Sequence, residues 1–219
     1  MAPLDPLHTC IALGLLATYL LVLGVINLSS RPLVTTGARD ASALAIAIAG
    51  LVVAGPMELF LIEEAAVFWG GWVWAIMLGA YALAVLLLIL MMRPRVVIYN
   101  ITLEQLRPLL ADVVARLDSD ARWAGEGLVM PQLGVQLHVD ALPMMKNVQL
   151  VASGTNQNLD GWRELNSSLR AALRKARTTP NPYGVSLVSF GVLLVAAITY
   201  NLARDPTAVM QALNEMLRR

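Results

Sequence analysis

The sequence has a single cysteine and two histidines among its 219 residues. One cysteine excludes an internal disulfide framework, and Cys10 lies inside a long apolar run, which indicates a buried thiol. Protein zinc sites need several Cys, His or carboxylate ligands brought together, and His8 and His138 are far apart in the chain. No catalytic or ligand-binding motif is recognisable. We therefore expect no cofactor and no metal site, and we rank an enzymatic function last.

Charged residues are scarce as well. They make up 14% of the chain, whereas globular proteins average about 25%. The deficit is local, because eleven of the sixteen Lys and Arg residues fall between positions 93 and 183. The formal net charge of +1 predicts no strong attraction to nucleic acid. Long apolar runs occupy most of the remaining chain.

Four of these runs have the length of a membrane span. A helix needs about 20 apolar residues to cross the hydrocarbon core of a bilayer. The first run differs from a secretion signal, because no Lys or Arg precedes it and because it is too long. We therefore predict a multi-pass integral membrane protein with four transmembrane helices. They are expected at Leu7–Leu28, Ala41–Ile62, Gly71–Met92 and Val185–Leu202.

Small residues recur at every fourth position in the second and third runs. Such stripes let helix backbones approach closely in lipid, so we expect these runs to form an antiparallel hairpin with the stripes in contact. Gly55-Pro56 should kink the second run, because proline donates no backbone hydrogen bond. Residues 29–40, with Pro32 and Gly37, are expected to form a turn. The stripes are Ala41, Ala45 and Ala49, and Gly71, Ala75 and Gly79.

The polar region after the third run reads as a small soluble domain. Thr102 and Gln105 form a capping box at the start of a helix, and Asp160 is expected to cap a second helix. Alternating apolar residues predict short strands before the first helix and between the two helices. An α+β two-layer sandwich in the order β-α-β-β-(β)-α follows. The strands are expected at Val96–Ile101, Arg122–Ala124, Leu128–Met130, Gly134–Asp140 and Asn147–Ser153.

The predicted fold class is thus a membrane α-helical protein in a three-plus-one arrangement, with the α+β domain inserted. The regions are a three-helix transmembrane part at 1–92, the soluble domain at 93–183, a fourth transmembrane helix at 184–203 and an amphipathic surface segment at 204–219. Lys and Arg accumulate in cytoplasmic loops, so the basic domain is expected in the cytoplasm and both termini outside. In the alternative that stays open, the fourth run only lies along the membrane and the C-terminus is inside. The predicted location is a bacterial inner membrane.

Glu58 is the candidate functional residue inside the membrane. It follows Gly55-Pro56 within the second run. A carboxylate at that depth costs about 2.5–3.5 kcal/mol on insertion scales, and such residues often line proton or ion routes. A second reading stays open: the span ends near Leu59, and Glu58 then reaches water at the outer interface with Glu63 and Glu64.

Two surface features of the soluble domain are candidate contact sites. Leu142, Pro143, Met144 and Met145 form an apolar hairpin tip, although turns are normally polar. The tip either touches lipid or a partner protein, or folds back over the core of the domain. A basic run is expected in the last turns of the second helix, where it either binds anionic headgroups or is simply solvated. It comprises Arg170, Arg174, Lys175 and Arg177.

The sequence favours a non-enzymatic role. A domain tethered to the membrane at both ends suits an accessory, scaffold or sensor subunit that meets a membrane or cytoplasmic protein, or a second copy of the chain. The expected contact surfaces are the tip and the strand face of Gln136, His138 and Asp140. The alternative is an oligomeric ion or proton transport component that uses Glu58.

Overall fold

The computed structural model describes residues 6–57, 69–155, 157–204, 206–207, 210–211 and 214. The chain divides into two compact units. The helical unit contains residues 1–23, 41–91 and 186–219, and the α/β unit contains residues 24–40 and 92–185. Glu58 and most of the predicted amphipathic segment at 204–219 lie outside the described residues.

Four helices within the described residues are long and apolar enough to cross a membrane. At most 17% of the positions in the apolar window of any of them are buried, so most of their apolar side chains are at least partly exposed. The four predicted runs are therefore confirmed as long helices as far as the described residues extend, which for the second run is to Met57. They are α1 (Pro6–Leu28), α2 (Gly37–Val52, continued by the π-helical turn η1 at Val53–Met57), α4 (Trp72–Met91) and α7 (Tyr183–Arg204).

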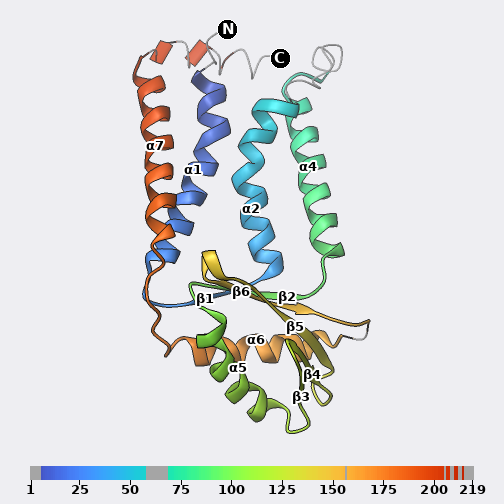
Figure 1. The fold of residues 1–219 in the computed structure, drawn as a ribbon. Helices are drawn as coiled ribbons and strands as arrows, with labels where there is room; N and C mark the ends of the chain where they lie inside the picture. Colours follow the sequence, from blue (N-terminus) through green and yellow to red (C-terminus); the bar gives the residue numbers. More distant parts are fainter. Residues whose placement is uncertain are drawn as a thin grey trace. The chain divides into compact units, whose positions relative to one another are not determined.

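Helix α1 packs between α7 and α2, and α4 follows on the other side of α2 (Figure 1). A Cβ added at Gly191 of α7 would lie 2.8 Å from the Leu21 side chain of α1. A Cβ added at Gly50 of α2 would lie 1.9 Å from the backbone oxygen of Ile11 in α1. Glycines therefore allow both close approaches to α1.

The predicted contact between the two small-residue stripes is wrong for α4. Gly71, Ala75 and Gly79 are exposed, and a Cβ at Gly79 would have no neighbour within 4 Å. Helices α2 and α4 instead meet where Tyr81 Oη donates a 2.7 Å hydrogen bond to the backbone oxygen of Ala45. The buried residues of α2 are Gly37, Ala47 and Gly50, and none of them belongs to the expected stripe.

The regular helix of α2 ends where the sequence places Gly55-Pro56. Val53–Met57 forms a π-helical turn that contains Pro56. Proline removes one backbone donor from the α-helical ladder, so the regular α-helical hydrogen-bond pattern is interrupted there. The expected irregularity in this span is thus present.

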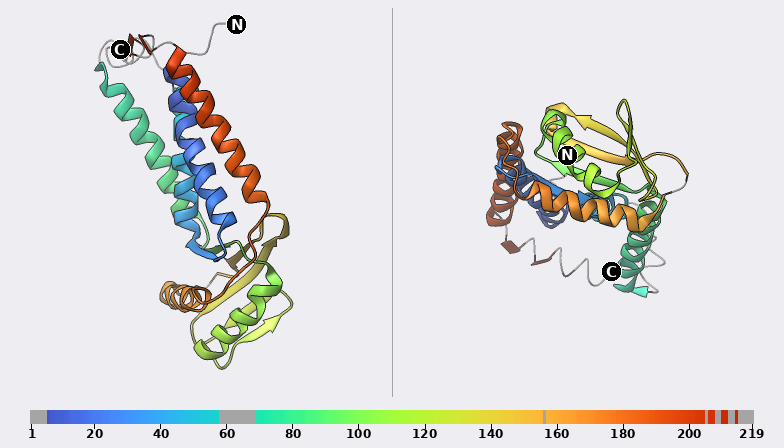
Figure 2. Two further views of the ribbon diagram at one scale, coloured as in Figure 1. Left: turned by 90° about the vertical axis from the view of Figure 1, so that its left-hand side faces the viewer. Right: turned by 90° about the horizontal axis from the view of Figure 1, so that it is seen from below.

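The described residues of the α/β unit form a six-stranded antiparallel sheet in the order β1-β2-β6-β5-β4-β3. Helices α5 (Leu103–Leu117) and α6 (Leu159–Leu173) pack against one face of it (Figures 1 and 2). The strands are β1 (Leu33–Thr36), β2 (Arg95–Tyr99), β3 (Arg122–Ala124), β4 (Gly127–Met130), β5 (Val135–Leu142) and β6 (Asn147–Ala152).

The core lies between this sheet and its two helices. Alternate strand residues such as Ile98, Leu137 and Leu150 are fully buried, together with Leu106 of α5 and Leu165 of α6. The period-two burial of β5 is the alternation that the sequence predicts. The helix-facing side of the sheet was therefore readable from the sequence.

Two helix caps can be compared with the predictions. The capping box of Thr102 and Gln105 is confirmed at the start of α5. The predicted cap of α6 is wrong by two residues, because Asn158 is the N-cap and its side chain accepts from the backbone N–H of Asp160. Asp160 itself lies in the first turn, where its charge favours the helix dipole.

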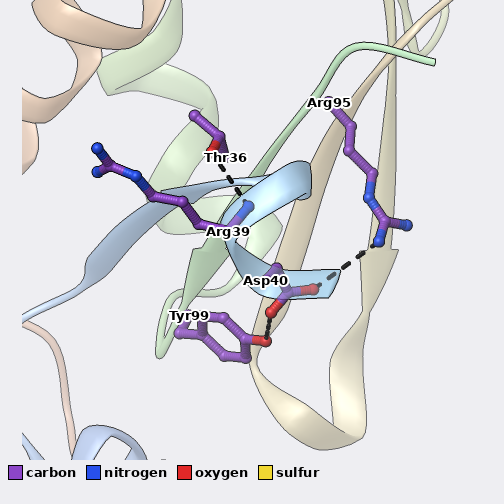
Figure 3. Close-up of polar contacts among 5 residues, drawn as sticks. All are labelled: Thr36, Arg39, Asp40, Arg95 and Tyr99. Carbon is purple, nitrogen blue, oxygen red and sulfur yellow. Dashed lines mark hydrogen bonds and ion pairs between the residues drawn. The ribbon is translucent and has the colours of Figure 1, made fainter. Parts of the chain in front are cut away.

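The predicted turn at residues 29–40 is also wrong in part. Leu33–Thr36 forms the edge strand β1, which pairs with β2. Thr36 ends this strand, and its Oγ1 accepts a 3.4 Å hydrogen bond from the backbone N–H of Arg39 at the start of α2 (Figure 3). The first loop therefore adds a strand to a sheet that otherwise forms from residues beyond 92.

Candidate functional site

Part of the sheet surface opposite α5 and α6 is exposed. On β5, the side chains of Gln136, His138 and Asp140 alternate with the core residues and are exposed. We call these three residues the open sheet face. Neighbouring positions on β4 and β3, Val129 and Arg122, are exposed too and align with Gln136 in one row of the sheet. The surface combines acceptors, donors and an apolar side chain.

His138 is paired with an acidic residue of the adjacent turn. Its Nε2 lies 3.6 Å from Glu126 Oε2, and both side chains are more than half exposed. An exposed pair of this kind contributes about 0–1 kcal/mol. Among the described residues, no group of three or more His, Cys, Asp or Glu side chains is placed to hold a metal ion.

The first turn of α2 is attached to β2 by polar contacts. Tyr99 donates its hydroxyl hydrogen bond to Asp40, and the Arg95 guanidinium lies 3.9 Å from the other carboxylate oxygen (Figure 3). The stem of Arg95 crosses Gly37 so closely that a Cβ there would lie 2.1 Å from Arg95 Cγ. Glycine at position 37 therefore permits this contact.

A second polar cluster joins the end of α1 to the segment that leads into α7. We call it the helix junction, formed by residues 27–30, residues 178–181 and Asn100. The backbone N–H of Thr178 donates to the Ser30 oxygen at 3.0 Å, and that of Asn181 donates to the Asn27 oxygen at 2.8 Å. The two chain segments are thus held side by side by main-chain hydrogen bonds.

Asparagine side chains complete the helix junction. Asn100 donates its amide both to the Ser29 oxygen and to Thr178 Oγ1, and Asn181 donates to Asn27 Oδ1 at 3.2 Å. All three asparagines are at most 5% exposed. Buried amides are costly unless they are hydrogen-bonded, so this cluster fixes a specific arrangement of the three segments.

The apolar tip, Leu142–Met145, is exposed. Leu142, Met144 and Met145 are 50%, 71% and 55% exposed, respectively. Residues 143–145 form a 3-10 turn between β5 and β6, which Lys146 ends in the left-handed conformation at φ 46°. The alternative in which the tip folds back over the core of its own domain is therefore wrong.

The basic run is spread over the end of α6 and the following linker. Helix α6 ends at Leu173, so Arg170 alone lies within it, and Arg174 is its C-cap. Arg174, Lys175 and Arg177 are exposed, whereas Arg170 is half-buried. The expectation that all four occupy the last helical turns is wrong. The linker carries them towards Thr178 of the helix junction.

Glu58, the remaining predicted site residue, lies outside the described residues. The structure instead draws attention to Asp40, Arg95, Asn27, Asn100 and Asn181, which the sequence did not single out. Comparisons of the chain with protein-family models, with curated proteins and with solved structures found no match. The geometry of these surfaces is accordingly the basis for any functional assignment.

Proposed function

We propose that this chain is a multi-pass integral membrane protein of the accessory, scaffold or sensor class. In this proposal α1, α2, α4 and α7 span the membrane, and the α+β domain inserted between α4 and α7 presents the open sheet face to a protein partner. The uncovered apolar surface of the four helices supports the membrane location, because such surface is stable in lipid and unfavourable in water. The partner is a membrane or cytoplasmic protein or a second copy of the chain.

The attachment of the domain to the helix ends supports a presenting role. The α/β unit includes the last residues of α1 and the first residues of α2 and α7. The Asp40 contacts and the helix junction fix these ends to the sheet. A domain held in this way is restricted to the membrane plane, where a partner meets it with reduced loss of rotational freedom.

We further propose that the domain is cytoplasmic in a bacterial inner membrane. Exposed basic residues follow α1, lie in the first turn of α2 and follow α4, and they include Arg31, Arg39 and Arg93. Such residues favour the cytoplasmic side. In this orientation Arg174, Lys175 and Arg177 contact anionic headgroups, which attract basic juxtamembrane segments.

The orientation predicts how introduced cysteines react. In a Cys10→Ala background, a cysteine at Ser167 on the exposed side of α6 should be protected from a membrane-impermeant maleimide in intact cells and react after lysis. A cysteine at Ala2 should react in intact cells, because both termini are expected outside. The reverse pattern would place the domain outside the membrane.

The open sheet face carries the proposal of a protein partner. The opposite face of the sheet is occupied by α5 and α6, whereas Gln136, His138 and Asp140 point away from this core and are exposed. A row of mixed polar and apolar side chains on a rigid sheet suits recognition more than it suits catalysis. The transport alternative stays a prediction, since Glu58 lies outside the described residues.

A photoreactive residue at Gln136 tests the partner surface. In native membranes it should give a discrete cross-linked species, whereas the same residue at Arg163, on the exposed side of α6, should not. Asp140→Lys should reduce the adduct several-fold, because it reverses one charge of the surface. Equal adducts at both positions, or an adduct that Asp140→Lys leaves unchanged, would contradict the assignment. An adduct of twice the chain mass identifies the partner as a second copy.

A further inference from the structure

The apolar tip differs from the rest of the exposed surface of the α/β unit. It places a leucine and two methionines, each at least half exposed, around Pro143. Exposed turns are normally polar, and grouped apolar side chains commonly mark a contact with a protein or a membrane. The contacts of the residue that follows, Lys146, distinguish these two occupants.

Lys146 fixes the tip to the segment that leads into α7. Its ammonium group donates to Thr179 Oγ1 at 2.9 Å and to the Thr179 backbone oxygen at 3.1 Å. The Pro180 backbone oxygen lies at 3.4 Å. Helix α7 begins at Tyr183, three residues after Pro180. Since an extended chain spans at most about 3.6 Å per residue, the Lys146 contact lies within roughly 11 Å of the start of α7.

The helix junction also places the end of α1 next to the segment that Lys146 contacts. Thr178, which precedes the residue that Lys146 contacts, donates to the Ser30 oxygen two residues beyond the end of α1. The backbone N–H of Ile101 also donates to the Lys146 oxygen at 2.8 Å, and this links the tip to Asn100. The last residues of α1 and the segment that leads into α7, which both belong to the α/β unit, therefore lie beside the residue that ends the tip.

We propose that Leu142, Met144 and Met145 insert into the interfacial layer of the bilayer that α1 and α7 cross. Tyr183, the first residue of α7, is exposed and is of the residue type that concentrates at headgroup level. The Lys146 contact at the end of the tip lies within roughly 11 Å of Tyr183. Apolar side chains in this layer are stabilised by burial at the boundary between headgroups and acyl chains. The flexible methionine side chains can adapt to the irregular packing of lipid at this boundary.

Lipid is favoured over a protein partner by the position of the tip. A partner would have to reach a surface held next to two helix ends, whereas the membrane is already present there. The inference rests on the proposed membrane location of the helices. It does not depend on a partner at the open sheet face, which is a separate surface and has a separate test.

The test measures where a fluorophore at the tip resides. Met144→Cys in a Cys10→Ala background is labelled with an environment-sensitive dye, and the full chain is reconstituted in phosphatidylcholine nanodiscs. The matched control is Leu159→Cys, also an exposed apolar residue. It lies at the start of α6, whose 15 residues separate it by about 22 Å from the end that enters the linker.

We expect the Met144 label to emit at shorter wavelength, to be quenched several-fold less by iodide than the Leu159 label, and to be quenched by headgroup-labelled lipid. Equal iodide quenching at both positions would overturn the proposal. Shielding that appears only with two chains in one disc would overturn it in favour of a protein contact. Met145→Cys repeats the measurement, so that the result does not depend on one folded variant. The maleimide experiment separately shows whether the chain spans the membrane at all.

Discussion

Replacing Gly50 by valine is expected to separate α2 from α1 and to destabilise the helical unit. A Cβ at this position would lie 1.9 Å from the backbone oxygen of Ile11 and 2.9 Å from its carbonyl carbon. Backbone atoms cannot move aside as a flexible side chain can, so the two helices must move apart. Overpacking typically costs about 1–3 kcal/mol, and we expect the upper end of that range. The thermal unfolding midpoint of the detergent-solubilised protein measures the effect.

Gly79→Val is the matched control in α4. A Cβ at Gly79 has no neighbour within 4 Å, and valine is, if anything, a better helix former than glycine. The change should therefore alter the free energy of unfolding by no more than about 0.5 kcal/mol, the usual range for exposed positions. Two variants with equal losses would show that the close approach of α2 to α1 is not what Gly50 provides.

Gly50 and Gly79 also show that the sequence predicts the long helices but not which of them are in contact. Composition and length predicted four long apolar helices, and all four are present in the described residues. A stripe of small residues, however, indicates only that a close approach is possible. It does not identify the neighbour. Gly79 belongs to a regular stripe and is exposed, whereas Gly50 lies outside the expected stripe and makes the close contact.

The α/β unit was more predictable because its signals are local. The Thr102 capping box and the alternation along β5 each depend on residues close together in the sequence, and both agree with the structure. Strand β1 was missed since its four residues, Leu33–Thr36, contain little alternation and find their partner strand more than fifty residues later. Residues 33–36 are a strand because they pair with β2, and a pairing between residues so far apart in the sequence cannot be recognised from the residues near β1.

The helix junction was missed for the same physical reason. Asn27 and Asn181 are 154 residues apart in the chain, and nothing near either residue distinguishes a buried, hydrogen-bonded asparagine from a solvated one. The position of Asn100 in the sequence is more informative. It follows a buried strand and precedes the capping box, a place where a residue with φ of 60° favours asparagine or glycine.

Asn100→Leu is expected to open the helix junction. The substitution removes both donors to Ser29 and Thr178, each worth about 1 kcal/mol. It also puts a side chain that disfavours positive φ at 60°, which adds about 1–2 kcal/mol. We expect a total loss of about 3–4 kcal/mol. Asn100→Gly should lose only the hydrogen-bond contribution, about 2 kcal/mol, because glycine adopts this conformation freely.

Amide hydrogen exchange distinguishes opening of the junction from general unfolding. The N–H groups of Thr178 and Asn181 donate to the Ser30 and Asn27 oxygens, so in both Asn100 variants they should exchange faster, by about tenfold for each 1.4 kcal/mol lost. The amides of the central strand β6 should stay protected in Asn100→Gly. Uniform acceleration throughout the sheet would instead mean that Asn100 stabilises the whole domain. Unchanged exchange at Thr178 would contradict the prediction. It would mean that the main-chain hydrogen bonds hold the two segments together and that the Asn100 amide contributes nothing to this attachment.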